Sequence, residues 1–370
     1  MGSMSLQAES STSGLTNRTD FSPLDDVEQG IPGLLTIQSD GSVVRSNIFL
    51  QNVDACQIPV DGVASKDVVV DSDRGLIARI FVPMGKKQEE ERSIHKKLPV
   101  TLFVHGGGFC MFSASTVIFH DFCRKMAQKA NTLVVSIDYR LAPEHRLPTA
   151  YNDCFDFLKW LQSQASEEDR STVDPWLDCY ADFSRCFWFG ESAGANIVHH
   201  IALRATTEDL RPLQVKGLVL SQPFFGSEER TASEIELEHD EPIIPPALCD
   251  EFWKFSLPHG ASRDHPYSNP LNEVLPPLSK LDLPRMLVVV GGLDPLRDHQ
   301  FSYVSHVHEA GKNVKLLFFR DAQHSFPLMA DQSMYADMLL KCLVKFMQRR
   351  SKPTETSGCR RRISACMNAC

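Results

Sequence analysis

One serine lies in a setting that could make it a nucleophile. Ser192 is the centre of the pentapeptide Gly-Glu-Ser-Ala-Gly at 190–194, which follows an apolar run. Glycines on both sides remove side chains that would clash in a sharp strand-to-helix turn, and such a turn exposes the serine hydroxyl. It also leaves the N–H of Ala193 free at a helix start, where negative charge is favoured. The pentapeptide alone is equally consistent with an ordinary glycine-bounded turn, so other residues must decide.

A glycine triplet offers the hydrogen-bond donors that an activated serine needs. The triplet directly follows His105 and a short apolar run, and consists of Gly106, Gly107 and Gly108. Consecutive glycines after a strand expose backbone N–H groups with no side chains in front of them. Together with the N–H of Ala193, they predict an oxyanion hole. The alternative interpretation is a flexible glycine loop.

The remaining partners of a nucleophilic serine are an acid and a histidine, in that order along the chain. His324 is the one histidine after Ser192 that sits between a late apolar run and a final helical pattern. Asp294 directly follows another apolar run, and catalytic residues gather at strand ends. We therefore predict a triad of Ser192, Asp294 and His324. Asp298 and Asp321 are the alternative acids.

The elements that must position these residues form a regular series. Strands are predicted at 99–104, 132–137, 186–189, 215–220, 285–290 and 315–319, and helices at 119–130, 150–162, 195–204, 247–257 and 335–347. Strands that alternate with helices predict parallel βαβ units and a sheet covered by helices. Earlier alternating runs at 35–37, 42–45, 66–70 and 76–82 predict antiparallel strands at the start of the same sheet. The fold class is therefore α/β with a mixed, mostly parallel sheet.

The alternation breaks at about 224–284, which predicts an insertion that forms a cap over the strand ends with the N-terminal segment. Residues 1–30 are predicted to be flexible, 31–350 to form the main domain, and 351–370 to be disordered, because the two ends lack a core pattern. The acidic run 228–241 is interpreted as a solvated surface of the cap.

Five aromatic residues near these motifs are candidates to line an apolar substrate pocket. They are Phe109, Phe112, Phe224, Trp253 and Phe326. For each of them, ordinary packing in the core or the cap is an equally good interpretation.

Composition excludes several other classes of protein. The net charge of −9 argues against nucleic acid and anionic membrane surfaces as partners. No apolar run is long enough for a transmembrane helix, and no secretory signal is visible. The 11 cysteines show no C-x-x-C pair, so we expect free thiols in the cytoplasm or nucleus, with no metal and no cofactor. The sequence does not indicate an oligomeric state.

Taken together, these motifs resemble the plant carboxylesterases of the hormone-sensitive-lipase branch of the α/β-hydrolases. The matching stretches are residues 105–109, 139–148, 190–194, 263–266 and 291–298. The resemblance implies an eight-stranded sheet with a cap, the triad and oxyanion hole named above, and hydrolysis of small to medium apolar esters through an acyl-enzyme on Ser192. Two positions depart from the family pattern: Glu191, where many relatives carry Asp, and Ser325, where Gly is common.

Other functions occur on the same scaffold. The gibberellin receptors resemble these esterases but have lost the catalytic histidine, whereas His324 is present here. A receptor for a hydrophobic ligand or hormone, and a non-hydrolytic cyclase or lyase, therefore stand as the alternatives to a small-molecule esterase.

Overall fold

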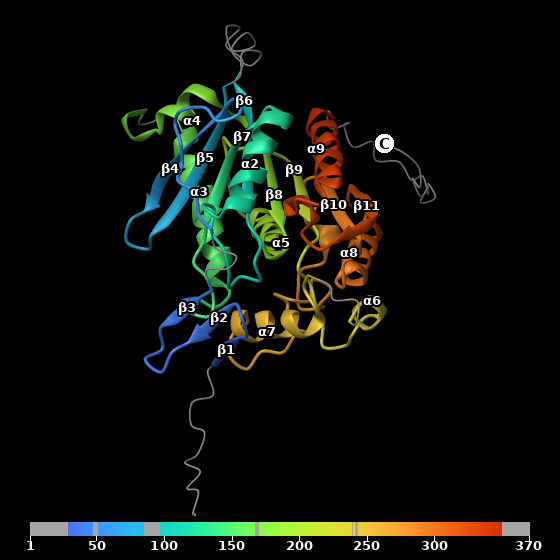
Figure 1. The fold of residues 1–370 in the computed structure, drawn as a ribbon. Coiled ribbons are helices and arrows are strands. Elements are labelled where there is room, and N and C mark those ends of the chain that lie inside the picture. Colours follow the sequence, from blue (N-terminus) through green and yellow to red (C-terminus); the bar gives the residue numbers. More distant parts are fainter. Residues whose placement is uncertain are drawn as a thin grey trace, which may run out of the picture.

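An eight-stranded sheet forms the centre of the protein. The computed structural model describes residues 29–46, 51–84, 97–166, 170–238, 240 and 243–349. The strand order is β11-β10-β9-β8-β6-β7-β5-β4 (Figure 1). The strands are β4 (Val63–Asp71), β5 (Leu76–Pro83), β6 (Leu98–Val104), β7 (Leu133–Asp138), β8 (Ala181–Glu191), β9 (Val215–Ser221), β10 (Met286–Leu293) and β11 (Val314–Gln323).

The sheet is mixed, as the sequence predicts. β4 pairs antiparallel with β5, and β5 antiparallel with β7. All pairs from β7 through β6, β8, β9 and β10 to β11 are parallel. The central strands are buried along most of their length because helices cover both faces, which is why they read as continuous apolar runs. Parallel strands place their carboxyl ends, and the residues that follow, at one edge of the sheet.

One strand prediction is wrong. The runs at 35–37 and 42–45 do not begin the main sheet. They form a separate antiparallel sheet of β1 (Gln29–Ile31), β2 (Leu35–Ile37) and β3 (Val43–Arg45). Of the apolar side chains in these strands, Ile31 and Leu35 are buried in the main core cluster, whereas Val44 is exposed. β1 also contacts α7 (Pro246–Ser256).

Helices cover the sheet on both sides. On one face, α2 (Val117–Ala130) packs against α9 (Ser333–Gln348). On the other face lie α3 (Thr149–Ala165), α5 (Ala193–Ala205) and α8 (Arg297–Glu309). The shorter helices are α4 (Pro175–Tyr180), α6 (Ala232–Glu236) and the 3-10 turns η1 (Arg170–Thr172), η2 (Leu278–Lys280) and η3 (Phe326–Leu328).

The carboxyl ends of the parallel strands are covered by the small sheet and by α6 and α7, which occupy the lower part of Figure 1. Both helices come from the segment for which the sequence predicts an insertion. Of the predicted flexible stretch 1–30, residues 1–28 lie outside the described residues, whereas Gln29 and Gly30 belong to β1. The predicted tail 351–370 also lies outside the described residues.

The prediction of a solvated acidic run at 228–241 is wrong for Glu234, which is buried. Its side chain completes a capping box with Thr231 at the start of α6, and it also accepts hydrogen bonds from Arg230 and His299. These donors satisfy the carboxylate and allow its burial.

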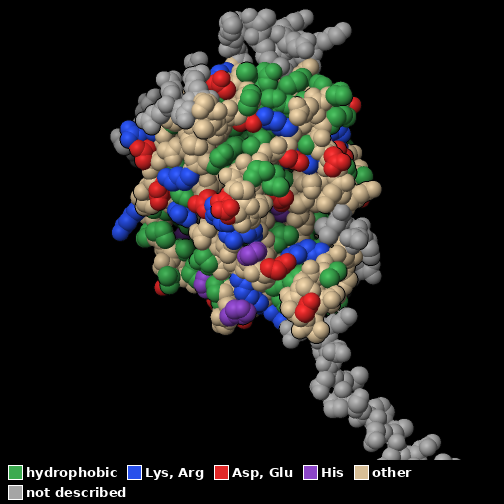
Figure 2. All heavy atoms as spheres, turned by 90° about the vertical axis from the view of Figure 1, so that its left-hand side faces the viewer, with side chains coloured by type: hydrophobic (Ala, Val, Ile, Leu, Met, Phe, Trp, Pro, Cys, Tyr) green, Lys and Arg blue, Asp and Glu red, His purple; other side chains and the backbone are tan. Residues whose placement is uncertain are grey.

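The surface of the protein carries interspersed charges of both signs on the face that Figure 2 shows. Among the residues described, no helix is both long and apolar enough to cross a membrane.

Candidate active site

Ser192 occupies the turn between β8 and α5, and its backbone is in an unusual conformation, with φ 52° and ψ −118°. The chain can turn this sharply because residues 190 and 194 are glycines, which have no Cβ. A Cβ at Gly190 would clash with the carbonyl of Gly194, and one at Gly194 would clash with the carbonyl of Val104. Such a backbone conformation costs on the order of 1–3 kcal/mol and persists only where the surrounding structure holds it. Here Ser192 N donates to Ser221 O at 2.9 Å, and Ser192 O accepts from Phe224 N at 3.0 Å.

The structure brings Ser192, His324 and Asp294 into direct contact. His324 Nε2 lies 2.9 Å from Ser192 Oγ, and His324 Nδ1 lies 2.8 Å from Asp294 Oδ2. All three side chains are buried. A carboxylate can only accept hydrogen bonds, so the proton belongs on Nδ1, and Nε2 is left as an acceptor for the serine hydroxyl.

The two alternative acids lie elsewhere. Asp298 accepts a hydrogen bond from Ser233 N on α6, at 2.8 Å. Asp321 is exposed on β11. Neither contacts His324, whereas Asp294 leaves the end of β10 directly beside it.

The charge environment of His324 favours its protonated form. Burial alone would lower the pKa of its imidazole. The nearby carboxylate and hydrogen bond of Asp294, together with the charge of Glu191, outweigh burial and raise that pKa above the usual value. The site thus stabilises a positive charge on the ring, which a base acquires when it takes the proton of a nucleophile.

Asp294 is itself held by donors that the sequence analysis missed. Gln300 Nε2 donates to Asp294 Oδ2 at 2.9 Å, and Gln222 Nε2 donates to the same oxygen at 3.1 Å. Leu296 N donates to Oδ1 at 2.9 Å. Gln222 follows β9 and also donates to Gln323 O, next to His324. Neither glutamine belongs to a motif, and no sequence signal distinguishes them from other glutamines.

The glycine loop lies against the serine. A Cβ at Gly106 would lie 3.0 Å from Ser192 Cβ. Gly107 and Gly108 have φ of 106° and 58°, in a region that disfavours other residues, and a side chain at Gly108 would clash with the ring of Phe252.

Three backbone N–H groups, two in the glycine loop and one directly after Ser192, make no hydrogen bond to another group of the described residues. They are the N–H groups of Gly107, Gly108 and Ala193. Ala193 is the first residue of α5, where N–H groups have no partner within the helix.

The predicted pocket residues lie in three places. Phe224 stacks on Trp253 with ring centres 4.4 Å apart, and Phe109 lies 5.5 Å from Trp253, so these three form one cluster. Phe112 lies beside Gly107. Phe326 lies elsewhere: it packs on Phe319 and Tyr335 in the cluster beneath α9.

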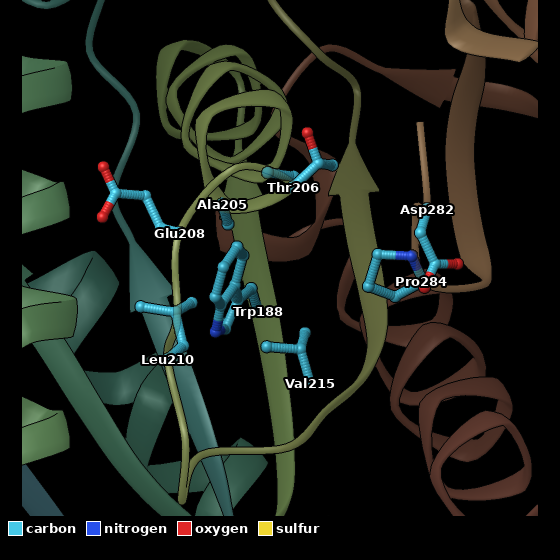
Figure 3. A pocket seen from close by; sticks show the side chains of 9 residues that line it. Trp188, Ala205, Thr206, Glu208, Leu210, Val215, Asp282 and Pro284 are labelled. Atoms are coloured by element: carbon cyan, nitrogen blue, oxygen red, sulfur yellow. The ribbon is translucent and has the colours of Figure 1, made fainter. Parts of the chain in front are cut away.

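A cavity of about 180 Å³ lies away from these residues. Figure 3 shows its lining side chains, which surround Trp188 near the end of α5 and the start of β9. No residue of the predicted site lines it.

Comparison with known proteins identifies the family. Residues 101–328 match the family described as having the alpha/beta hydrolase fold, and residues 50–144 match the carboxylesterase family. A 3-O-acetylpapaveroxine carboxylesterase from Papaver somniferum is 40% identical over 71% of this chain and 84% of its own length. The chain belongs to the plant carboxylesterase branch of the α/β-hydrolase family.

Other members of the family are similar over comparable lengths. Carboxylesterase 20 from Arabidopsis thaliana is 38% identical over 74% of this chain and 83% of its own length. A 2-hydroxyisoflavanone dehydratase from Glycine max is 34% identical over 85% of this chain and 96% of its own. Among solved structures, a thermostable carboxylesterase cloned from a metagenomic library superposes with a TM-score of 0.62 at 28% identity, covering 80% of this chain and 92% of its own.

Proposed function

We propose that the protein is a serine carboxylesterase that hydrolyses esters of small to medium apolar metabolites. The observation that carries this proposal is His324, which lies within hydrogen-bond distance of both Ser192 Oγ and the buried Asp294. This is the arrangement in which a histidine can take a proton from a serine while a carboxylate orients the ring.

The proposed reaction has two acyl-transfer steps. His324 takes the Ser192 proton as Oγ attacks the ester carbonyl, and the N–H groups of Gly107, Gly108 and Ala193 bind the oxyanion. His324 then gives the proton to the departing alkoxide, and an acyl-enzyme forms. Water attacks that acyl-enzyme with His324 again as the base, which releases the carboxylic acid and frees Ser192.

Substitution of the nucleophile tests this proposal. Ser192→Ala should lower kcat/KM for p-nitrophenyl butyrate by roughly a thousandfold or more, because the acyl-enzyme can no longer form. The same variant should lose labelling by a fluorophosphonate, whereas Ser163→Ala, at an exposed position on α3, should retain both. Hydrolysis by Ser192→Ala within about tenfold of the wild-type rate would contradict the proposal.

A second candidate function is elimination of water without ester cleavage. It is favoured by the similarity to 2-hydroxyisoflavanone dehydratases. In that reaction His324 would act as a base and the oxyanion donors would stabilise an enolate, with no covalent bond to Ser192. Turnover of a 2-hydroxyisoflavanone that survives in Ser192→Ala would favour this alternative. Saturable binding of a hydrophobic ligand with no labelling and no turnover would instead favour a receptor.

We also infer that the protein works in a reducing compartment, the cytoplasm or the nucleus. Eight cysteines in the described ranges are free thiols, and six of these are buried. Free thiols persist where the cell keeps cysteine reduced.

A further inference from the structure

Glu191 is a buried carboxylate to which the reaction above gives no role. It is the last residue of β8, directly before Ser192, and only 1% of its surface is exposed. Burying a carboxylate is costly unless hydrogen bonds or opposite charges compensate. We therefore expect hydrogen bonds or positive charges that compensate for the burial of Glu191.

The side chain of Glu191 joins two loops that flank the serine. Its Oε1 accepts a hydrogen bond of 2.6 Å from Ser325 Oγ, in the loop that carries His324. Its Oε2 lies in the space that a Cβ at Gly106 would occupy, so any side chain there would clash with it. One carboxylate thus connects the end of β8 to the glycine loop and to the histidine loop.

Ser325 is held in a conformation that presents its hydroxyl to Glu191. Its backbone lies in the left-handed region, with φ 58°, and its carbonyl accepts from Leu328 N at 2.9 Å. A hydroxyl that donates to a carboxylate at this distance forms a charge-assisted bond, which is stronger than a bond between neutral groups. Because Ser325 directly follows His324, the bond restrains the imidazole as well.

Glu191 also acts on His324 through its charge. The charged groups that influence the imidazole are Asp294, beyond Nδ1, and Glu191, on β8. Burial and the negative charge of Asp294 raise the pKa of Glu191, whereas the charge of His324 and the hydroxyl of Ser325 lower it in part. The negative form of Glu191 and the positive form of His324 therefore stabilise each other.

We propose that Glu191 is a positioning residue of the active site, which holds the His324 loop through Ser325 and supplies a second negative charge to the imidazolium formed during acyl transfer. This inference rests on the proposed esterase mechanism. The two contributions can be separated, because one depends on the hydrogen bond and the other on the charge.

Two substitutions make that separation. Glu191→Gln keeps an oxygen that can accept from Ser325 but removes the charge. It should move the acidic limb of the pH profile of kcat/KM to lower pH by about half a unit or more, because that limb reports the pKa of His324 in the free enzyme. Ser325→Ala keeps the charge but removes the bond. It should lower kcat by about three- to tenfold with little change in KM and a smaller shift of the limb.

A matched control is Glu234→Gln, which neutralises another buried and hydrogen-bonded carboxylate, on α6. It should lower the thermal unfolding temperature and leave the acidic limb in place. A second readout does not need turnover: in a Ser192→Ala background, an NMR titration of His324 should show the same downward shift on Glu191→Gln.

The inference is overturned if Glu191→Gln leaves both the limb and the NMR titration within about 0.1 pH unit of the parent, far less than a nearby buried charge produces. A wild-type kcat in Ser325→Ala would overturn the restraining role of the hydrogen bond. A wild-type protein that neither hydrolyses esters nor reacts with fluorophosphonate would instead contradict the esterase function, while the titration would still decide whether Glu191 acts on His324.

Discussion

Gln300 Nε2 lies 2.9 Å from Asp294 Oδ2, the same carboxylate oxygen that contacts His324 Nδ1. Asp294 is completely buried, so its oxygens depend on protein donors in place of water. Gln300 comes from the first turn of α8 and Gln222 from the loop after β9, so two different elements fix the carboxylate that orients the histidine.

Removing one of these donors should weaken the reaction. We expect Gln300→Leu to lower kcat/KM by roughly tenfold, the effect of losing one hydrogen bond to a charged group. Gln164→Leu is the matched control, because Gln164 is a buried glutamine that bonds the backbone near α4. It should lower the unfolding temperature but not kcat/KM. Equal losses of kcat/KM in the two variants would show that the Gln300 effect is only structural.

The glycine loop should not tolerate a methyl group at Gly108. Gly108→Ala should lower kcat/KM by about a hundredfold, because the Phe252 ring would displace the N–H groups proposed to bind the oxyanion. Gly311→Ala imposes a similar backbone penalty, since Gly311 has φ 75°, but a Cβ there meets nothing within 4 Å. That variant should be less stable but should keep the wild-type kcat/KM. Ester kinetics and thermal unfolding of both variants test the prediction, and an active Gly108→Ala would contradict it.

Arg45, on β3, links the small sheet to the loops that follow β6 and β7. Its guanidinium donates to both carboxylate oxygens of Glu144, at 2.8 and 2.7 Å, and to the carbonyls of Cys110 and Ala142. Arg45→Gln should lower the free energy of unfolding by about 1–3 kcal/mol, the range for hydrogen bonds to charged groups.

Urea unfolding of Arg45→Gln measures that loss. The control is Arg211→Gln, because Arg211 pairs with Asp209 while its side chain is 87% exposed. An exposed pair contributes little, so this variant should stay close to wild type. Equal losses in the two variants would mean that the Arg45 contacts do not fasten the small sheet.

Buried neutral histidines should make the protein less stable in acid. Burial lowers the pKa of His200 to about 3 and that of His105 to about 4. In the unfolded chain these groups bind protons near pH 6.5, so stability is fully present above that value and is lost as the pH falls toward the folded values. At pH 5 each of these histidines should lower the free energy of unfolding by about 2 kcal/mol.

Substitution of one such histidine tests the predicted loss of stability in acid. His200→Phe preserves the ring that stacks on Tyr151, and should reduce the fall in unfolding temperature between pH 7 and pH 5. His259→Gln, at an exposed position, should retain the full fall. An identical fall in wild type and His200→Phe would contradict the assignment.

Much of the fold could be predicted because its signals are local. A strand that ends in glycine, serine and glycine has few backbone options, and buried parallel strands read as apolar runs wherever they occur. The positions of Ser192, Asp294 and His324 follow from their places just after such strands. The pattern at 35–37 and 42–45 predicts the wrong sheet because a three-residue strand carries no information about which strand it pairs with.

Contacts between distant segments could not be predicted in this way. Glu191 and Ser325 are the two departures from the family motifs, and in the sequence they are unrelated, yet they share a hydrogen bond. In the sequence, nothing distinguishes Gln222 and Gln300 from other glutamines. Their contact with Asp294 exists only because β9, β10 and α8 pack together. The sequence alone determined which residues could react and in what order they occur. Only the tertiary structure decided which side chains orient them, because the pairing of strands far apart in the chain sets those distances.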